Sequence, residues 1–209
     1  MAVDQTQSWA YAESASQENV AIATARQAAR DYGISSLSPA TGAFLQVLAA
    51  SAHVRSAVEI GTGTGVSGLY LLGASGDLSL TSIDIESETQ HIAREAFSKM
   101  GIRSGRTRLI NGRSADILPR LAARSYDLVL IDADPMEARG DALEALRVLR
   151  PNGILVLAHA LMSGRVADPA RREDDVVAMR NLGRELLESP DIRSAMIPIG
   201  DGLLVASPK

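Results

Sequence analysis

The 209-residue chain has no cysteine, and only 3% of its residues are aromatic. The lack of cysteine excludes disulfide scaffolds, thiolate zinc sites, cysteine nucleophiles and CxxC redox chemistry. The few aromatic rings and a formal net charge of -4 leave no stacking platform and no basic stripe, which argues against a nucleic-acid binder. We therefore expect a small or polar ligand.

Long hydrophobic runs are missing as well. No apolar run approaches the roughly 18 residues of a membrane span, and Met1 to Ser16 carries acids where a signal peptide has a basic end and an apolar stretch. We therefore expect a cytoplasmic protein with no membrane partner. A chain of this length buries roughly 70% of its unfolded surface, so one compact domain needs no disulfide or metal to fold.

From Arg55 onward, short β-branched or leucine-rich runs alternate with helical patterns, which is typical of a parallel sheet covered on both faces. The expected strands are Ala57 to Ile60, Leu78 to Ile83, Arg108 to Ile110, Tyr126 to Ile131, Ile154 to Leu157, Ala195 to Ile199 and Leu203 to Ala206. The expected helices are Val20 to Tyr32, Pro39 to Ser51, Val66 to Leu72, Ser87 to Met100, Ala115 to Ala123, Asp141 to Leu149 and Asp174 to Glu188. Only Gly200-Asp201-Gly202 separates the last two strands, so they form an antiparallel hairpin at one edge of the sheet.

Local signals mark the ends of several helices. Ser38 is the expected N-cap of a helix whose first residue is Pro39, and Gly101 is the expected left-handed cap after Met100. Ser87 and Gln90 have the spacing of a capping box. Residues 1 to about 16 are expected to be frayed or bound to a partner subunit.

The first strand of the expected sheet runs into Gly61-Thr62-Gly63-Thr64-Gly65. Ligands of open parallel sheets bind beyond the carboxyl ends of the strands, and glycines let backbone N–H groups approach such a ligand at a helix N-terminus. The third glycine stands one residue too early for the GxGxxG dinucleotide fingerprint, which weakens the signal for NAD. The alternative is a tight turn that binds nothing.

Acidic residues follow the second and fourth strands. Asp84 lies 23 residues beyond Gly61, close to the offset of about 20 at which a carboxylate meets a ribose diol in such folds. The pair Asp132 and Asp134 could face a metal, an ammonium or a sulfonium. Each of these acids has the alternative of being a solvated turn residue.

Five segments together resemble the S-adenosylmethionine-dependent O-methyltransferases of the catechol and caffeoyl-CoA type, in the family's order and spacing from about Ser38 to the C-terminus. They are Glu59 to Ser67, Ser82 to Glu86, Tyr126 to Asp134, Ser163 to Pro169 and Ile199 to Leu203. The resemblance implies a Rossmann-like three-layer α/β sandwich, with a seven-stranded, mostly parallel sheet whose last strand is reversed. It also implies a homodimer. We expect an N-terminal helical extension over residues 1–52 before a cofactor-binding region over residues 53–209, within one compact domain.

The resemblance implies a role for each residue of the cofactor site. Glu59, Gly61 and Gly63 line the cofactor loop, and Ser67 holds the methionine carboxylate. Asp84 takes the ribose hydroxyls, and Asp134 lies near the methionine end. Gly112 and Ser114 flank the adenine, and Asp132 is a further member of both the cofactor-binding and the catalytic set.

The chain departs from the family at the metal site. That site uses the first Asp of an Asp-Ala-Asp-Lys turn, here Asp132, and an Asp-Asn pair whose positions fall on Ala158 and His159. The lysine that helps to deprotonate the acceptor falls on Pro135. Mg²⁺ needs several oxygen ligands, so we predict no metal site of the usual kind.

Without the metal, methyl transfer needs another base, and His159 is the candidate because its pKa is ordinarily near neutrality. We hypothesise that His159 is the general base, or that it binds a softer metal together with Asp132; the alternative is a histidine hydrogen-bonded in a loop. His53 and His91 are expected on the surface.

Three functions compete at this stage. The first is an active methyltransferase on a small hydroxylated acceptor, and the second is a cofactor-binding module that has lost catalysis. The third is an NAD-binding oxidoreductase. The acceptor pocket is expected between the N-terminal helices and the loop from Met162 to Ala170, with Trp9, Tyr11 and Met162 as candidate wall or contact residues.

Overall fold

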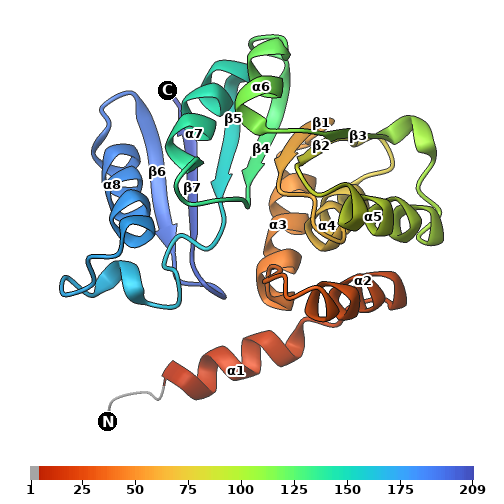
Figure 1. The fold of residues 1–209 in the computed structure, drawn as a ribbon, viewed down its shortest axis with the longest axis horizontal. Helices are drawn as coiled ribbons and strands as arrows, with labels where there is room; N and C mark the ends of the chain where they lie inside the picture. Colours follow the sequence, from red (N-terminus) through yellow and green to blue (C-terminus); the bar gives the residue numbers. More distant parts are fainter. Residues whose placement is uncertain (1–4) are drawn as a thin grey trace.

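The computed structural model describes residues 5–209 as a seven-stranded sheet with helices on both faces (Figure 1). The strands are β1 (Ser56–Ile60), β2 (Ser79–Asp84), β3 (Thr107–Asn111), β4 (Tyr126–Ile131), β5 (Leu149–Leu157), β6 (Ile192–Ile197) and β7 (Leu203–Pro208). The α-helices are α1 (Gln5–Ala15), α2 (Val20–Asp31), α3 (Pro39–Ser51), α4 (Val66–Ala74), α5 (Ser87–Lys99), α6 (Ser114–Ile117), α7 (Ala138–Val148) and α8 (Asp174–Glu188). Three short 3-10 helices span Ser104–Arg106, Leu118–Arg120 and Arg165–Ala167.

The strand order is β3-β2-β1-β4-β5-β7-β6, in which only β7 runs antiparallel to its neighbours. The order reverses between β1 and β4, which are adjacent in the sheet, and this is where an open α/β sheet binds ligands. The predicted fold class is therefore confirmed, together with the hairpin of β6 and β7.

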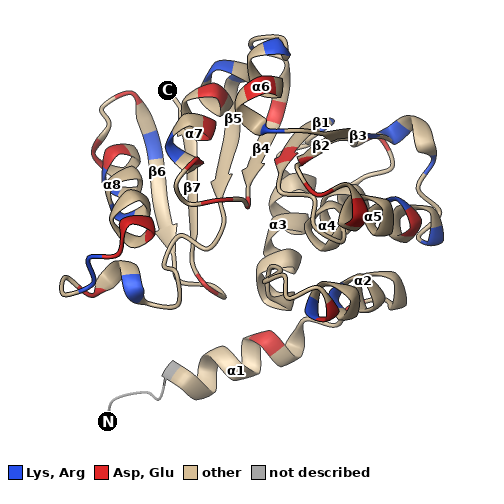
Figure 2. Cartoon of the chain, in the orientation of Figure 1, with Lys and Arg blue, Asp and Glu red and all other residues tan. Residues whose placement is uncertain are grey.

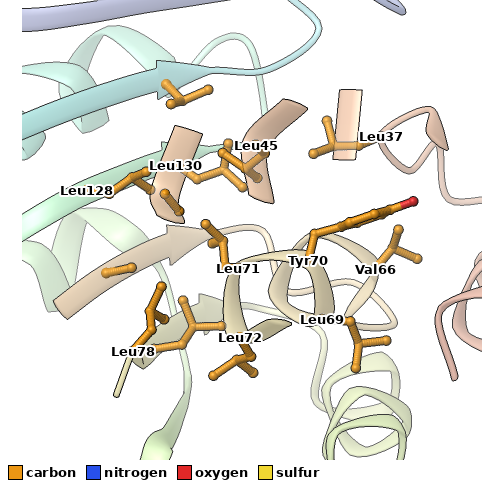
Figure 3. Packing of buried hydrophobic residues seen from close by; sticks show 14 of the residues in the cluster. Leu37, Leu45, Val66, Leu69, Tyr70, Leu71, Leu72, Leu78, Leu128 and Leu130 are labelled. Carbon is orange, nitrogen blue, oxygen red and sulfur yellow. The ribbon is translucent and has the colours of Figure 1, made fainter. Parts of the chain in front are cut away.

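Two apolar cores fill the spaces between the sheet and its helices. The core under α3, α4 and α5 contains Leu45, Leu71 and Leu130 (Figure 3), and the core under α7 and α8 contains Val129 and Leu182. Every residue from Val66 to Leu72 is buried, because α4 lies between the sheet and its neighbouring helices. This packing fixes the N-terminus of α4 against the end of β1.

Several predicted boundaries are wrong. The expected helix from Ala115 to Ala123 is one turn of α-helix followed by a 3-10 turn, because Pro119 removes an N–H donor from the second turn. Strand β5 begins at Leu149, and its pairing with β4 is irregular where Asn152 takes a φ of 62°. Strand β6 begins at Ile192, three residues before the expected start at Ala195.

Two of the three predicted helix caps are confirmed. The Ser38 hydroxyl accepts the Thr41 N–H at 3.3 Å with Pro39 at the first helical position, and Gly101 has a φ of 77°, as predicted. The predicted capping box at Ser87 is wrong, since Glu86 is the N-cap of α5 and makes no side-chain cap. The Asp84 carboxylate accepts the Glu86 N–H instead, at 2.9 Å.

The expectation of a frayed N-terminus is wrong over residues 5–15, which form α1; residues 1–4 lie outside the described part of the chain. Glu13 is the single charged residue of α1 (Figure 2). Its carboxylate accepts the Ser38 hydroxyl at 2.7 Å and the Ala40 N–H at 3.0 Å. Helix α1 is thereby attached to the N-terminus of α3, where a negative charge is favourable.

Candidate functional site

A pocket of about 290 Å³ lies beyond the carboxyl ends of β1, β2 and β4, and we call it the strand-end pocket. Its wall combines the glycine loop after β1, the acids after β2 and β4, and the segment between α2 and α3. The wall residues are Ile34, Ser35, Ser36, Gly61, Thr62, Gly63, Thr64, Val66, Ser67, Asp84, Ile85, Glu86, Thr89, Asp132, Ala133 and Asp134. The sheet thus brings together six of the predicted cofactor residues from three strand ends, Asp132 among them.

The glycine loop takes a shape that side chains would prevent. Gly61 has a φ of 94°, and a Cβ there would lie 1.9 Å from the backbone oxygen of Asp132. Gly65 has a φ of 91° and is the N-cap of α4. The loop therefore passes close to β4 and delivers the first N–H groups of α4 to the pocket, where a helix N-terminus favours an anion.

Asp84 holds the glycine loop and faces the pocket. Its Oδ2 accepts the Gly63 N–H at 2.8 Å, and its Oδ1 accepts the Glu86 N–H at 2.9 Å. An ionised carboxylate accepts about four hydrogen bonds, so two bonds from a vicinal diol remain possible. The position suits the ribose role that the resemblance implies.

Glu59 is fully buried beneath the glycine loop and is not a wall residue of the strand-end pocket. Its carboxyl accepts the hydroxyls of Ser67 at 2.6 Å and Ser82 at 2.5 Å. Burial raises the pKa of Glu59 to about 7, against the lowering effect of these two bonds, and the charges of Asp132 and Asp84 raise it further. Glu59 therefore acts as a buried support of the loop.

Ser67 lines the pocket, but its hydroxyl hydrogen is already donated to Glu59. The hydroxyl can then only accept a hydrogen bond, which does not suit a carboxylate. The backbone N–H of Ser67, in the first turn of α4, is the group that could donate to a carboxylate.

Gly112 and Ser114 lie next to the site without forming its wall. The Gly112 N–H donates to the backbone oxygen of Asp84 at 2.8 Å, which fixes the loop after β3 beside the end of β2. Ser114 is buried and begins α6. Their predicted adenine contacts stay predictions.

Asp132, His159 and Asp201 form a line from the strand-end pocket toward the hairpin of β6 and β7. His159 Nδ1 lies 3.0 Å from Asp201 Oδ2, and His159 Nε2 lies 3.5 Å from Asp132 Oδ1. Within residues 5–209, the buried Nε2 has no hydrogen-bond partner. Burial raises the pKa of Asp132, and the imidazole opposes that shift.

Asp134 is an exposed wall residue of the strand-end pocket, and its Oδ1 accepts the Met136 N–H at 2.9 Å. The loop after β4 that carries Asp132 and Asp134 is acidic (Figure 2). With Asp84, these side chains give the pocket a negative potential that favours a cationic ligand.

The residues present do not fit the magnesium site that the resemblance implies. Position 158 offers a buried methyl group, and His159 offers one nitrogen already bonded to Asp201. Across the described residues, no group of three His, Cys, Asp or Glu side chains is placed to hold a metal. Asp132 alone cannot supply the oxygen ligands that Mg²⁺ needs.

The acceptor-pocket expectations are only partly met. Trp9 and Tyr11 of α1 are 55% and 76% exposed and do not line the strand-end pocket, whereas Met162 is buried. His53 and His91 are exposed, as predicted.

Sequence reasoning missed the partner of His159 and one wall of the pocket. Asp201 is 42 residues from His159, and the Gly-Asp-Gly turn was the signal that could have directed attention to it. No local pattern marks Ile34, Ser35 and Ser36 as wall residues, since they form an irregular segment between two helices.

Comparison with known proteins gives a consistent result. A family model described as O-methyltransferase matches residues 8–209. A Mycobacterium avium protein provisionally named an O-methyltransferase is 46% identical over 198 residues, which cover 94% of this chain and 89% of that protein.

Solved structures agree in fold. A Corynebacterium glutamicum protein has a TM-score of 0.87 and 34% identity, covering 95% of this chain and 94% of its own. The O-methyltransferase TomG of Streptomyces achromogenes, solved in complex with SAM, has a TM-score of 0.86 and 26% identity, and each chain is covered completely, at 100%.

Proposed function

Because the chain belongs to the O-methyltransferase family, we propose that it transfers a methyl group from S-adenosylmethionine to a hydroxyl oxygen of a small acceptor. The observation that carries the proposal is the strand-end pocket, in which a glycine loop, a helix N-terminus and four acidic residues meet. The SAM-bound structure of TomG supports the choice of donor. Neither loss of catalysis nor NAD-dependent oxidation is supported by these relatives.

The proposed donor contacts follow from the chemistry of each wall group. Asp84 accepts the two ribose hydroxyls, and the N–H groups at the start of α4, including that of Ser67, hold the methionine carboxylate. Gly61 and Gly63 let the backbone approach the donor, and Gly112 and Ser114 flank the adenine. Asp132 and Asp134 face the ammonium and the sulfonium, whose positive charges suit two carboxylates.

Bound in this pocket, the sulfonium would supply an electrophilic methyl group, and an oxygen nucleophile attacks its carbon in line with the leaving sulfur. The chain then has to place the acceptor hydroxyl beside the donor and remove its proton. We propose His159 as the general base, because its Nε2 has no hydrogen-bond partner among the described residues and Asp201 fixes the ring through Nδ1. A hydrogen bond from Nδ1–H to Asp201 leaves the lone pair on Nε2.

Three further features stay proposals. A homodimer is supported by α1, an 11-residue helix that leaves Trp9 and Tyr11 exposed and holds to the rest of the chain through Glu13. We treat residues 1–52 as a helical extension of the cofactor-binding domain 53–209. No described helix is long and apolar enough to cross a membrane, and the cytoplasmic location stays a prediction.

Titration calorimetry tests the proposed donor. S-adenosylhomocysteine, the demethylated product, is expected to bind in a one-to-one ratio, and NAD is expected to give no heat. In a thermal-shift assay, product at 100 times its dissociation constant should stabilise the fold by about 2.7 kcal/mol. Absence of heat at millimolar product contradicts the proposed function.

A further inference from the structure

A second pocket of about 320 Å³ lies beside the strand-end pocket, and we call it the hairpin pocket. The two pockets share Ser35 and Ser36 as wall residues. His159 lines the hairpin pocket while its Nε2 faces Asp132 in the other. A molecule in the hairpin pocket therefore lies next to the proposed methyl donor. The wall consists of Ser35, Ser36, Leu37, Ser38, Thr41, His159, Ser163, Gly200, Asp201 and Gly202.

The wall of the hairpin pocket is polar and contains no Phe, Tyr or Trp ring. Hydroxyl groups stand on five of its residues, and Leu37 is its one aliphatic side chain. A planar aromatic acceptor would need apolar or aromatic faces to stack against, as most small-molecule sites provide. This wall instead offers hydrogen-bonding groups from several directions.

The charge of the hairpin pocket is negative. Asp201 is the one carboxylate in the wall, which has no lysine or arginine. Behind the wall, the Glu13 carboxylate accepts the Ser38 hydroxyl, and the Arg26 guanidinium, which is paired with Glu18, donates to Ser36 and to the backbone oxygen of Leu37. Phosphate or carboxylate groups on an acceptor would face Asp201 with no lysine or arginine in the wall to pair with them. A neutral acceptor is favoured.

Two of the wall hydroxyls have no protein partner. Ser36 accepts from Arg26, and Ser38 and Thr41 bond to each other, but no hydrogen bond of the Ser35 or Ser163 hydroxyl is found within residues 5–209. Asp201 accepts from His159 Nδ1 and from the Ser163 N–H, which leaves about two of its four acceptor positions. Ser35 and Ser163 are exposed to solvent. A ligand rich in hydroxyls would pair with these groups, whereas an apolar ligand that covered them would leave them unpaired.

We propose that the methyl acceptor is a small neutral polyol of the cyclitol or sugar type, bound in the hairpin pocket. This inference rests on the proposed function. One acceptor hydroxyl oxygen forms the bond to the methyl carbon as the carbon–sulfur bond breaks, and sulfur keeps the electron pair to become a neutral thioether. The hydroxyl proton passes to His159.

An acceptor panel tests the substrate class. Protein with radiolabelled S-adenosylmethionine is incubated with myo-inositol, methyl α-D-glucopyranoside, catechol and a CoA thioester, and kcat/KM is measured for each. We expect methyl transfer to at least one polyol, at a kcat/KM above those of catechol and the thioester. A higher kcat/KM for catechol or the thioester overturns the inference, and so does the absence of transfer to both polyols.

Binding of S-adenosylhomocysteine to the same preparation is measured by calorimetry. If S-adenosylhomocysteine binds and methyl is transferred to catechol, only the polyol inference is contradicted. If S-adenosylhomocysteine does not bind, both the proposed function and the polyol inference are contradicted. The two failures are therefore distinguishable.

Two wall variants provide a second test. Ser163→Ala removes a hydroxyl without a protein partner and should raise the KM for the polyol about fivefold. Asp201→Asn should raise the same KM about tenfold. Both variants should bind S-adenosylhomocysteine with an affinity within twofold of the wild type. Ser104→Ala, in an exposed 3-10 turn, is the matched control and should leave KM unchanged. Unchanged KM in both wall variants overturns the placement of the acceptor.

Discussion

The ends of β1 and β2 differ from the ends of β4 and β5 in how their side chains are held in the site. At β1 and β2, the Asp84 carboxylate accepts two backbone N–H groups and Gly61 touches the backbone of β4. Beyond β4 and β5, Asp132 and His159 face each other at 3.5 Å without a hydrogen bond. The groups proposed for the ribose end are therefore held by hydrogen bonds to the backbone, whereas Asp132 and His159 contact each other only through their side chains.

The largest effect is expected from Gly61→Ala, which adds a methyl group 1.9 Å from the Asp132 carbonyl oxygen at a φ of 94°. Left-handed strain and overpacking together should lower the free energy of unfolding by about 4 kcal/mol. Urea denaturation measures this change in the free energy of unfolding. Gly76→Ala is the control, because nothing lies within 4 Å of its Cβ position, and it should change stability by less than about 0.5 kcal/mol. Equal effects of the two variants would contradict the tight approach of β1 to β4.

A pH effect is expected from Glu59, the buried acid under the same loop. Its pKa rises from 4.5 to about 7 in the folded state, so the native protein holds a proton that the unfolded chain releases between these values. Stability attributable to Glu59 is therefore fully present below about pH 4.5 and lost as the pH rises through 7. Glu59→Gln should be more stable than the wild type by about 3 kcal/mol at pH 8 and about equal at pH 4.5.

Chemical denaturation of the wild type and Glu59→Gln without donor, between pH 4.5 and 8, gives the difference in their free energies of unfolding. A difference between the two proteins that does not vary with pH would show that Glu59 is ionised in the native state.

In the acceptor half, His159→Ala should lower kcat about 100-fold, since a general base contributes at least that much. The dissociation constant of S-adenosylhomocysteine should stay within twofold, because His159 is not a wall residue of the strand-end pocket. His91→Ala on the exposed face of α5 is the control. Unchanged turnover removes His159 from the mechanism.

The smallest effect is expected from Asp84→Asn, which keeps the shape of the side chain but replaces one acceptor oxygen by a donor. Losing a charge-assisted bond to the ribose should weaken S-adenosylhomocysteine binding about tenfold, measured by calorimetry. Asp77→Asn is the control, because Asp77 lies in an exposed turn before β2. Its affinity for S-adenosylhomocysteine should match that of the wild type. An unchanged affinity in Asp84→Asn would show that Asp84 does not bind the ribose hydroxyls.

Much of the fold could be predicted because its signals are local. The seven strands, the hairpin of β6 and β7 and the cap at Ser38 all depend on residues close together in sequence. Two of the errors had local causes and one arose from strand pairing. Pro119 shortened the helix that was expected to reach Ala123. Asp84, fixed by its own contacts, bonds the Glu86 N–H at the start of α5, while Ser87 forms no capping box. The irregular register of β4 and β5 brings Leu149 into the strand.

The sequence by itself determined that glycines and acids follow strand ends, and therefore that a polar ligand binds at one edge of the sheet. It also determined the replacement of an Asp-Asn pair by Ala158 and His159. Only the tertiary structure decided that Glu59 lies beneath the loop and that Asp201 holds His159 across 42 residues. The reason is physical: strand order and side-chain packing set these contacts, and neither is encoded in the spacing of the residues that make them.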